Sequence, residues 1–311
     1  MQAYKLGVIG LGKIAQDQHL PVIGADPAFA LVAVSSQRGV AVDGVPHAFK
    51  DWQEMLRLDD LDAVAICTPP QPRYAIARAA LAAGKHVLLE KPPTATLSEL
   101  ADLERLAAGA GRTLFTTWHS QYNPAVEEAR RVLAGHAIER LLVTWKEDVR
   151  QWHPGQDWIW QAGGFGVFDP GINALSIVTR IVPEPIFLRR ADLAFPANKD
   201  APIAATLELG SGRPGEELRA VFDWRQTGEQ TWDIVVETSD GTRLALSGGG
   251  KRLEIDGKLV VETAPAEYQG IYRRFAALLA SGRSAVDTEP FRLVADAFMI
   301  GRRMTVEPFS G

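Results

Sequence analysis

The stretch that decides the fold of the first third of the chain is residues 4–17, YKLGVIGLGKIAQD. An apolar run leads into the spacing GxGxxA, formed by Gly10, Gly12 and Ala15, where a helical pattern begins. In that context the first glycine permits a tight turn and the second lets the backbone approach a pyrophosphate at the positive end of the helix. The small third residue lets the helix pack closely on a sheet. The stretch therefore predicts a dinucleotide-binding strand, turn and helix.

Short β-rich runs alternate with helical patterns from residue 4 to residue 117. We predict strands at 5–9, 30–35, 63–67, 86–89 and 113–117, and helices at 13–23, 51–58, 72–83 and 97–110. Asp51 and Ser98 are expected to cap the second and fourth of these helices. Strands that alternate with helices are typical of a doubly wound parallel sheet, so we expect an α/β Rossmann domain over residues 1–120.

The pattern changes after residue 120. A helix at 123–133 is followed by longer strands, predicted at 137–149, 186–193, 203–209, 217–224, 231–237 and 243–247, and by helices at 170–181, 269–280 and 291–302. Strands that cluster in this way indicate an α+β domain on a large, mostly antiparallel open sheet. We assign residues 121–311 to this domain and expect a C-terminal helix, about residues 290–304, to pack back on the Rossmann domain.

The composition excludes several classes of protein. The formal net charge is −5 and the basic residues are scattered, so nothing indicates binding to nucleic acid or to an anionic membrane. No apolar stretch approaches the ~20 residues of a membrane span and no signal peptide is evident, so we expect a cytoplasmic protein. The single cysteine, Cys67, lies in the apolar run DAVAIC and fits a buried, inert thiol. We find no spacing typical of metal ligands.

The end of the second predicted strand indicates which nucleotide is bound. NAD sites usually carry an acidic residue there for the ribose hydroxyls, whereas this strand runs into Ser36, Gln37 and Arg38. Asp26 has a suitable offset but lies in the turn before the strand. Because no carboxylate opposes a 2′-phosphate, we expect NADP to be bound and NAD also to be accepted. Taken alone, Arg38 fits a solvated loop cation equally well.

Further cofactor contacts are expected in the glycine turn and after the neighbouring strands: Gly10, Gly12, Lys13, Ile14, Thr68, Pro69, Glu90 and Lys91. The carboxyl ends of strands in a doubly wound sheet lie beside the cofactor. Lys91 follows the apolar strand HVLLE, and Pro92 and Pro93 stiffen the chain after it, so its direction is fixed. The alternatives are a surface lysine and, for Thr68, a structural turn.

A second group of candidate residues lies in GGFGVFDPGIN, residues 163–173. Asp169 fits the N-cap of a helix with Pro170 at the first helical position, which is a structural role. However, Asp169 and Asn173 are one helical turn apart and lie away from the apolar stripe of the same helix. We therefore expect these two side chains to lie together at the mouth of the helix.

Residues 145–160, WKEDVRQWHPGQDWIW, hold half of the chain's eight tryptophans together with Glu147 and His153. Aromatic faces beside carboxylates and a histidine suit a pyranose, which offers apolar C–H faces and hydroxyl groups. A core or an interface for the tryptophans, and a satisfied loop position for the histidine, are the alternatives. The predicted substrate contacts are Lys91, His119, Glu147, Trp152, His153, Asp169, Asn173 and Trp232.

These features together resemble the glucose-fructose oxidoreductase (Gfo/Idh/MocA) family, whose marks are an N-terminal GxGxx(A/G), an EKP motif that ends a strand, and a later DxGxH-type motif. The segments GKIAQDQHLP, GKHVLLEKPP, WKEDVRQWHPGQDWIW and GVFDPGINALSIVTRI are similar to its bacterial L-arabinose and D-galactose 1-dehydrogenases. The resemblance covers the whole chain. It implies NAD(P)-dependent oxidation of the anomeric carbon of L-arabinose, D-galactose or D-fucose to the aldonolactone.

The resemblance also implies that Lys91 and Asp169 occupy the family's catalytic positions. We expect a coupled pair in which Asp169 takes the proton of the anomeric hydroxyl and Lys91 binds that oxygen, or the reverse. Where the wider family has histidine, this chain has Asn173. Asparagine cannot titrate, so it can orient the substrate but cannot accept the proton.

Two other functions are compatible with the same pattern. One is a family oxidoreductase that acts on a cyclitol, a dihydrodiol or another sugar, and the other is a non-catalytic sensor of a sugar and a nucleotide. The joint presence of Lys91, Asp169 and Asn173 favours an enzyme. The exposed face that an open antiparallel sheet leaves is compatible with a homodimer.

Overall fold

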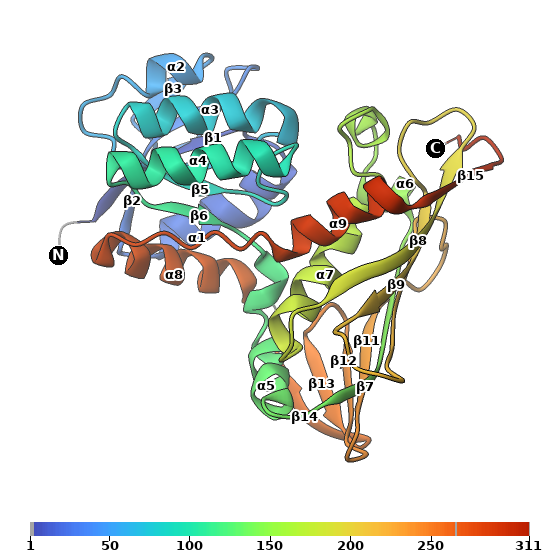
Figure 1. Ribbon diagram of the computed structural model, residues 1–311. Helices are drawn as coiled ribbons and strands as arrows, with labels where there is room; N and C mark the ends of the chain where they lie inside the picture. The colour runs from blue at the N-terminus through green and yellow to red at the C-terminus, as the bar shows by residue number, and fades with distance from the viewer. Residues whose placement is uncertain (1–2, 265, 311) are drawn as a thin grey trace. The chain divides into compact units, whose positions relative to one another are not determined.

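The computed structural model describes residues 3–264 and 266–310. These residues form two compact units, which Figure 1 shows by element. The first unit contains the described residues of Met1–Trp118 together with Tyr268–Asp287, and the second contains those of His119–Glu267 and Thr288–Gly311. The chain therefore crosses between the units three times.

The first unit is built on a parallel sheet with the strand order β3-β2-β1-β4-β5-β6. Its strands are β1 (Tyr4–Ile9), β2 (Phe29–Ser35), β3 (His47–Phe49), β4 (Ala63–Ile66), β5 (His86–Leu89) and β6 (Leu114–Thr116). The strand order changes direction between β1 and β4, and dinucleotides bind at such switch points. The predicted Rossmann architecture is confirmed. The edge strand β3 was not predicted, because its three residues are too few and too exposed to give a pattern.

Helices pack on this sheet (Figure 1): η1 (Ala15–His19), α1 (Leu20–Ala25), α2 (Trp52–Met55), α3 (Pro70–Ala82), α4 (Leu97–Ala110) and α8 (Glu267–Ser281). Asp51 caps α2 as predicted, since its carboxylate accepts from the Gln53 N–H at 2.8 Å. The prediction of Ser98 as the cap of α4 is wrong. Thr96 and Glu99 form a reciprocal capping box there, which satisfies two backbone N–H groups at once.

α8 belongs to the first unit although it comes after residues 119–267 of the second unit in sequence. Phe275 stacks on Phe29 and Phe115, with ring centroids 5.9 and 6.1 Å apart, and Tyr272 meets Phe29 edge to face at 5.4 Å. Burial of these rings stabilises the return of the helix. The segment predicted to pack back on the Rossmann domain, about residues 290–304, forms α9 (Glu289–Ile300) and β15 (Arg302–Val306) of the second unit, and its packing on the first unit stays a prediction.

The second unit contains a nine-stranded sheet in the order β14-β13-β12-β11-β7-β10-β9-β8-β15. Its other strands are β7 (Ile138–Lys146), β8 (Phe187–Pro196), β9 (Ala204–Gly210), β10 (Glu217–Asp223), β11 (Thr231–Thr238), β12 (Arg243–Ser247), β13 (Arg252–Ile255) and β14 (Lys258–Glu262). β7 pairs in parallel with β10, and β8 with β15, whereas the other pairings are antiparallel. The mostly antiparallel open sheet is confirmed, although β13, β14 and β15 were not predicted.

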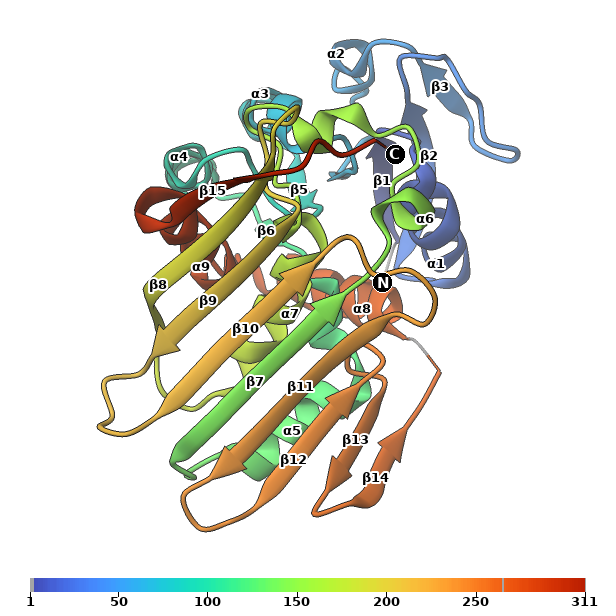
Figure 2. The same ribbon diagram turned by 90° about the vertical axis from the view of Figure 1, so that its right-hand side faces the viewer.

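The helices of the second unit lie against one face of its sheet (Figure 2). α5 (Pro124–Leu133) contacts β12, β13 and β14, α7 (Phe168–Ile181) contacts β7 and β11, and α9 contacts β8. Short helices occupy the connections: η2 (His119–Tyr122), α6 (Val149–Trp152) and η3 (Asp157–Trp160). α6 takes up the end of the strand predicted to reach residue 149. Over residues 3–264 and 266–310, no helix has the length and apolar character needed to cross a membrane.

Candidate active site

The two glycines of the nucleotide motif have different surroundings. Gly10 has a φ of +93°, and a Cβ placed on it would lie 2.9 Å from the backbone nitrogen of Thr68. Gly10 therefore serves the turn itself and its close packing on the chain that follows β4. A Cβ on Gly12 would meet nothing within 4 Å. The space beside the Gly12 backbone is open at the start of the helix, where a pyrophosphate would approach.

The chain after β2 forms a tight turn that carries the residues predicted to select the nucleotide. The Gly39 N–H donates to the Ser36 carbonyl at 2.8 Å, and the Val40 N–H donates to the Ser36 hydroxyl at 3.0 Å. Gln37 and Arg38 are exposed on this turn. Among the described residues, no carboxylate lies within ion-pair distance of the Arg38 guanidinium. The turn therefore presents a cation that a 2′-phosphate could bind.

Thr68, which follows β4, carries a buried polar atom that the protein does not satisfy. Its Oγ1 is buried without a hydrogen-bond partner among the described residues. Buried hydroxyls in proteins are nearly always hydrogen-bonded, so this one fits a contact to a bound nucleotide. Around the same edge Pro69 is exposed, Ile14 is 37% exposed, and the ammonium of Lys13 pairs with the Asp17 carboxylate.

A buried arginine, which the sequence pattern did not single out, holds this edge of the sheet together. Arg73, on α3, is 3% exposed and donates to the carbonyl oxygens of Thr68, Glu90 and Pro92. These carbonyls belong to the chain that follows β4 and β5. The one available signal was a basic residue on the side of a helix that also carries Ile76 and Ala77, both buried.

Lys91 follows β5 and is half-buried, and its peptide bond to Pro92 is cis. Glu90, directly before it, is 3% exposed. One Glu90 oxygen accepts from Tyr268 at 2.7 Å and lies 3.0 Å from His19 Nε2, while the other accepts from the Lys91 N–H at 2.8 Å. The carboxylate predicted to contact the cofactor thus has partners inside the first unit.

In the second unit, Glu147 lies directly after β7 and is 5% exposed. Its carboxylate accepts from Trp224 Nε1 at 3.2 Å and from Trp232 Nε1 at 2.9 Å. Burial raises the pKa of Glu147, and the indole hydrogen bonds and nearby His153 only partly oppose this effect. Indole N–H groups are donors without a formal charge, so they satisfy the carboxylate and leave its charge uncompensated.

Asp169 lies in the first turn of α7 and is 5% exposed. The structural alternative, an N-cap at Asp169, does not apply, since Val167 occupies that position and no side chain caps the helix. The Asp169 Oδ2 lies 3.5 Å from His153 Nε2, which in turn lies 3.9 Å from a Glu147 oxygen. One turn further along, Asn173 Oδ1 is buried and has no hydrogen-bond partner in the described parts of the chain.

Five of the six tryptophans of this unit divide into two groups, and Trp158 is partly exposed. Trp145, Trp160 and Trp224 are at most 7% exposed and belong to the core, so the structural alternative applies to them. Trp152 is 42% exposed and meets Trp232 edge to face, with ring centroids 5.4 Å apart. Trp152 therefore keeps an accessible aromatic face beside a ring that is tied to Glu147, as a stacking residue requires.

His119 begins η2 and pairs with a carboxylate that was not predicted. Its Nδ1 lies 3.2 Å from Glu267, which also accepts from Asn123 Nδ2 at 2.8 Å. Burial raises the pKa of Glu267, but His119 and Asn123 outweigh this effect and hold that pKa below its usual value. Glu267 thereby fixes the orientation of the His119 ring.

The structure thus brings the predicted residues together in two sets. Glu147, His153, Asp169 and Trp232 form one cluster of the second unit, and Thr68, Glu90 and Lys91 lie at one sheet edge of the first. Lys91 and Asp169 belong to different units, so the pairing of these two residues stays a prediction.

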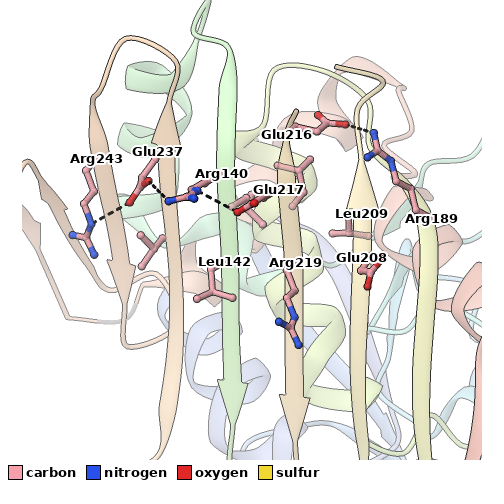
Figure 3. A pocket seen from close by; sticks show the side chains of 13 residues that line it. Arg140, Leu142, Arg189, Glu208, Leu209, Glu216, Glu217, Arg219, Glu237 and Arg243 are labelled. Atoms are coloured by element: carbon pink, nitrogen blue, oxygen red, sulfur yellow. Dashed lines mark hydrogen bonds and ion pairs between the residues drawn. The ribbon is translucent and has the colours of Figure 1, made fainter. Parts of the chain in front are cut away.

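A hollow of about 740 Å³ on the sheet of the second unit is not part of these sets (Figure 3). Four arginines and four glutamates line it. Three of these arginines pair with lining glutamates: Arg140 with Glu217 at 3.2 Å, Arg189 with Glu216 at 2.5 Å, and Arg243 with Glu237 at 3.9 Å. A surface of mutually compensated charges does not suit a neutral sugar, which needs aromatic faces and unpaired polar groups.

Comparison with known proteins gives consistent results. The GFO_IDH_MocA pattern, described as an oxidoreductase family with an NAD-binding Rossmann fold, matches residues 4–117. A galactose 1-dehydrogenase of Pseudomonas fluorescens is 46% identical over 99% of each chain. The crystal structure of a D-galactose-1-dehydrogenase protein from Rhizobium etli has a TM-score of 0.94 and 54% identity, and covers 100% of this chain and 99% of its own. A D-xylose 1-dehydrogenase (NADP(+)) of Haloferax volcanii is 27% identical over 83% of this chain and 82% of its own.

The two glycines provide a matched pair of variants. Gly10→Ala is expected to lower the free energy of unfolding by roughly 1–3 kcal/mol, because its Cβ would meet the Thr68 backbone at a positive φ. Gly12→Ala is expected to change stability by less than about 0.5 kcal/mol but to weaken NADP+ binding about tenfold or more. Thermal unfolding and NADP+ titration measure the two effects. Unchanged NADP+ affinity in Gly12→Ala would rule out close approach of the nucleotide there.

Proposed function

Because this chain belongs to the Gfo/Idh/MocA family of oxidoreductases, we propose that it is an NADP-dependent aldose 1-dehydrogenase that also accepts NAD. The proposed reaction oxidises the anomeric carbon of D-galactose, L-arabinose or D-fucose to the aldonolactone. The names of two similar proteins, both galactose 1-dehydrogenases, support this substrate class.

The observation that carries the proposal is the buried cluster around Asp169. This carboxylate lies 3.5 Å from an imidazole nitrogen of His153 and one helical turn from the unsatisfied amide oxygen of Asn173. A carboxylate, a histidine and an orphaned amide together can bind a hydroxyl group and remove its proton. In the other unit, the open space beside Gly12 and the orphaned hydroxyl of Thr68 fit a dinucleotide.

The chemistry requires loss of a hydride from C1 and of a proton from the hydroxyl on that carbon, which together leave the lactone carbonyl. The nicotinamide of the bound cofactor supplies the hydride acceptor. Lys91 binds the anomeric oxygen and stabilises the charge that develops there, and Asp169 accepts the proton. His153, which is 15% exposed in its side chain, can accept that proton next and pass it toward solvent. Asn173 orients the hydroxyl without titrating.

Recognition of the sugar is assigned to the aromatic and acidic groups around this cluster. Trp152 offers an exposed ring for the C–H face of a pyranose. Glu147 and His153 accept or donate hydrogen bonds to ring hydroxyls, and His119 and Trp232 complete the proposed contacts. D-Galactose and L-arabinose share ring stereochemistry and differ by one hydroxymethyl group, worth only ~1–3 kcal/mol of discrimination, so one site can take both.

The test of the function is a panel of aldoses, cyclitols and dihydrodiols with NADP+ and NAD+, followed by the absorbance of the reduced nicotinamide. D-Galactose and L-arabinose are expected to react fastest. If a cyclitol or a dihydrodiol is the best substrate, the chain has another activity of the family and the proposed function is wrong. Binding of both sugar and nucleotide without turnover would instead support the sensor.

Substitution of the proposed acid–base residues separates catalysis from binding. Asp169→Asn is expected to lower kcat by about 1,000-fold or more, because the proton acceptor is lost. His153→Gln keeps a polar group but cannot accept a proton, so it is expected to lower kcat by about 10–100-fold. Glu184→Gln, which changes a carboxylate paired with Arg213 in the same unit, serves as the control and is expected to leave kcat unchanged. Normal turnover by Asp169→Asn would remove Asp169 from this role.

Selection of NADP is assigned to Arg38. Arg38→Ala is expected to raise the KM for NADP+ about tenfold or more and to leave the KM for NAD+ within about twofold, because one charge-assisted contact to the 2′-phosphate is lost. Arg105→Ala, which removes an exposed arginine on α4, is the control. Equal changes in both KM values would mean that Arg38 does not contact the 2′-phosphate.

We also propose a homodimer that forms through the sheet face shown in Figure 3. Leu142 is 46% exposed there, among paired arginines and glutamates that could exchange partners across a twofold axis. Leu142→Glu is expected to convert a dimer to a monomer in sedimentation velocity. Met299→Glu, at a residue of α9 that is 81% exposed, is the control. A wild-type protein that sediments as a monomer would refute the proposed dimer.

A further inference from the structure

A group of buried polar side chains lies behind Lys91 in the first unit. It consists of His19 from η1, Glu90 from the end of β5, and Tyr268 and Tyr272 from α8. All four are at most 3% exposed. Polar groups buried to this extent are costly unless they satisfy one another, so the group must be held by specific contacts.

The contacts form a chain that ends at the backbone of Lys91. The Tyr272 hydroxyl lies 2.7 Å from His19 Nδ1, and the opposite ring nitrogen lies 3.0 Å from a Glu90 oxygen. Tyr268 donates to the same oxygen at 2.7 Å. The second oxygen of Glu90 is the one that accepts from the Lys91 N–H, at 2.8 Å.

The charges in this group favour an ion pair. Burial lowers the pKa of His19, but the Cys67 thiol, Tyr272 and Glu90 outweigh it and raise that pKa well above its usual value of 6.5. Burial raises the pKa of Tyr272 to about 12, so this phenol stays neutral. A protonated His19 therefore compensates the buried Glu90 carboxylate, whose charge alone would be costly there.

The backbone of η1 and two aromatic contacts fix the His19 ring. The Leu20 N–H donates to the Ala15 carbonyl, which makes the turn before His19 a π turn. Such turns are rare and occur often at functional sites. The His19 ring meets Tyr268 and Tyr272 edge to face, with centroids 4.9 and 5.7 Å away. The ring therefore has a defined orientation before any ligand binds.

We propose that His19 and Tyr268 are positioning residues, which hold one oxygen of Glu90 so that the other fixes the backbone of Lys91. Glu90 then acts on the reaction through Lys91 rather than by contact with the nucleotide. This inference rests on the catalytic role proposed for Lys91. The α8 helix, distant in sequence from the EKP segment, thereby takes part in placing the catalytic lysine.

The experiment uses the full chain and three variants. Tyr268→Phe removes one hydroxyl from Glu90, and His19→Gln keeps a hydrogen-bonding amide but no charge. Tyr74→Phe is the matched control, since Tyr74 donates to Asp102 at 2.8 Å in the same unit. Hydrogen exchange of the Lys91 amide, NADP+ affinity, and kcat and KM for D-galactose are measured for each.

In Tyr268→Phe and His19→Gln, exchange at the Lys91 amide is expected to be about tenfold faster, because its acceptor is no longer held. The kcat is expected to fall about tenfold while the KM for D-galactose and the NADP+ affinity stay within about twofold. Tyr74→Phe is expected to match wild type in every measurement. Two variants of different severity keep the test valid if His19→Gln does not fold.

Three results would overturn the inference. Unchanged exchange at Lys91 in Tyr268→Phe would mean that the group does not fix that backbone. Faster exchange at Lys91 with unchanged kcat would mean that the buried polar group has only a structural role. Weaker NADP+ binding with unchanged exchange would mean that Glu90 contacts the nucleotide. Because exchange is measured without substrate, it tests the placement of Lys91 even if no aldose is oxidised and the proposed function fails.

Discussion

The edge of the parallel sheet where a nucleotide would lie depends on one buried guanidinium. Arg73 donates to three carbonyl oxygens in the chain segments that follow β4 and β5, and so joins the backbone at Thr68 to the backbone around Lys91. Arginine suits this position because its planar group presents several donors in fixed directions and stays charged. The three carbonyl oxygens that face Arg73 are therefore hydrogen-bonded. Thr68 Oγ1, at the same edge, has no hydrogen-bond partner among the described residues.

Two buried glutamates that directly follow strands show that burial alone does not determine the charge state of a carboxylate. Glu90 has a protonated histidine that compensates its charge and a tyrosine that donates to the same oxygen, and together they direct its second oxygen. Glu147 is held by indole N–H groups, and burial raises its pKa. The first carboxylate is thereby suited to hold a backbone in place, and the second is suited to respond to what binds beside it.

The sequence pattern predicted the elements that have strong local signals. The strands of the Rossmann sheet are apolar on both faces, and GxGxxA occurs between a strand and a helix. Both the strands and the nucleotide motif could therefore be predicted. β13 was missed because its four residues are too few to establish a pattern, and β14 and β15 were missed because they are short and largely exposed. The cap at Thr96 was missed because the reciprocal contact with Glu99 competes with a nearby serine that looks equally suitable.

The parts of the site that were missed depend on residues distant in sequence. Asp169, Asn173, Glu147 and His153 were found from their spacing on one helix and one segment. Nothing local indicated that Tyr268 would reach Glu90 or that Glu267 would reach His119, because such contacts arise only once the chain returns. The indole partners of Glu147 show the same limit, since Trp224 directly follows β10 and Trp232 lies on β11.

The return of α8 also has a consequence for how the protein is made. Phe29 and Phe115 need Tyr272 and Phe275 to cover them, and those residues leave the ribosome only after nearly all of the second unit has been synthesised. Domains usually fold in order as the chain emerges, at roughly 5–20 residues per second. Here the apolar surface around Phe29 and Phe115 stays uncovered while residues 119–267 of the second unit are synthesised. The order of synthesis thus delays completion of the first unit until residues 119–267 of the second unit have been made.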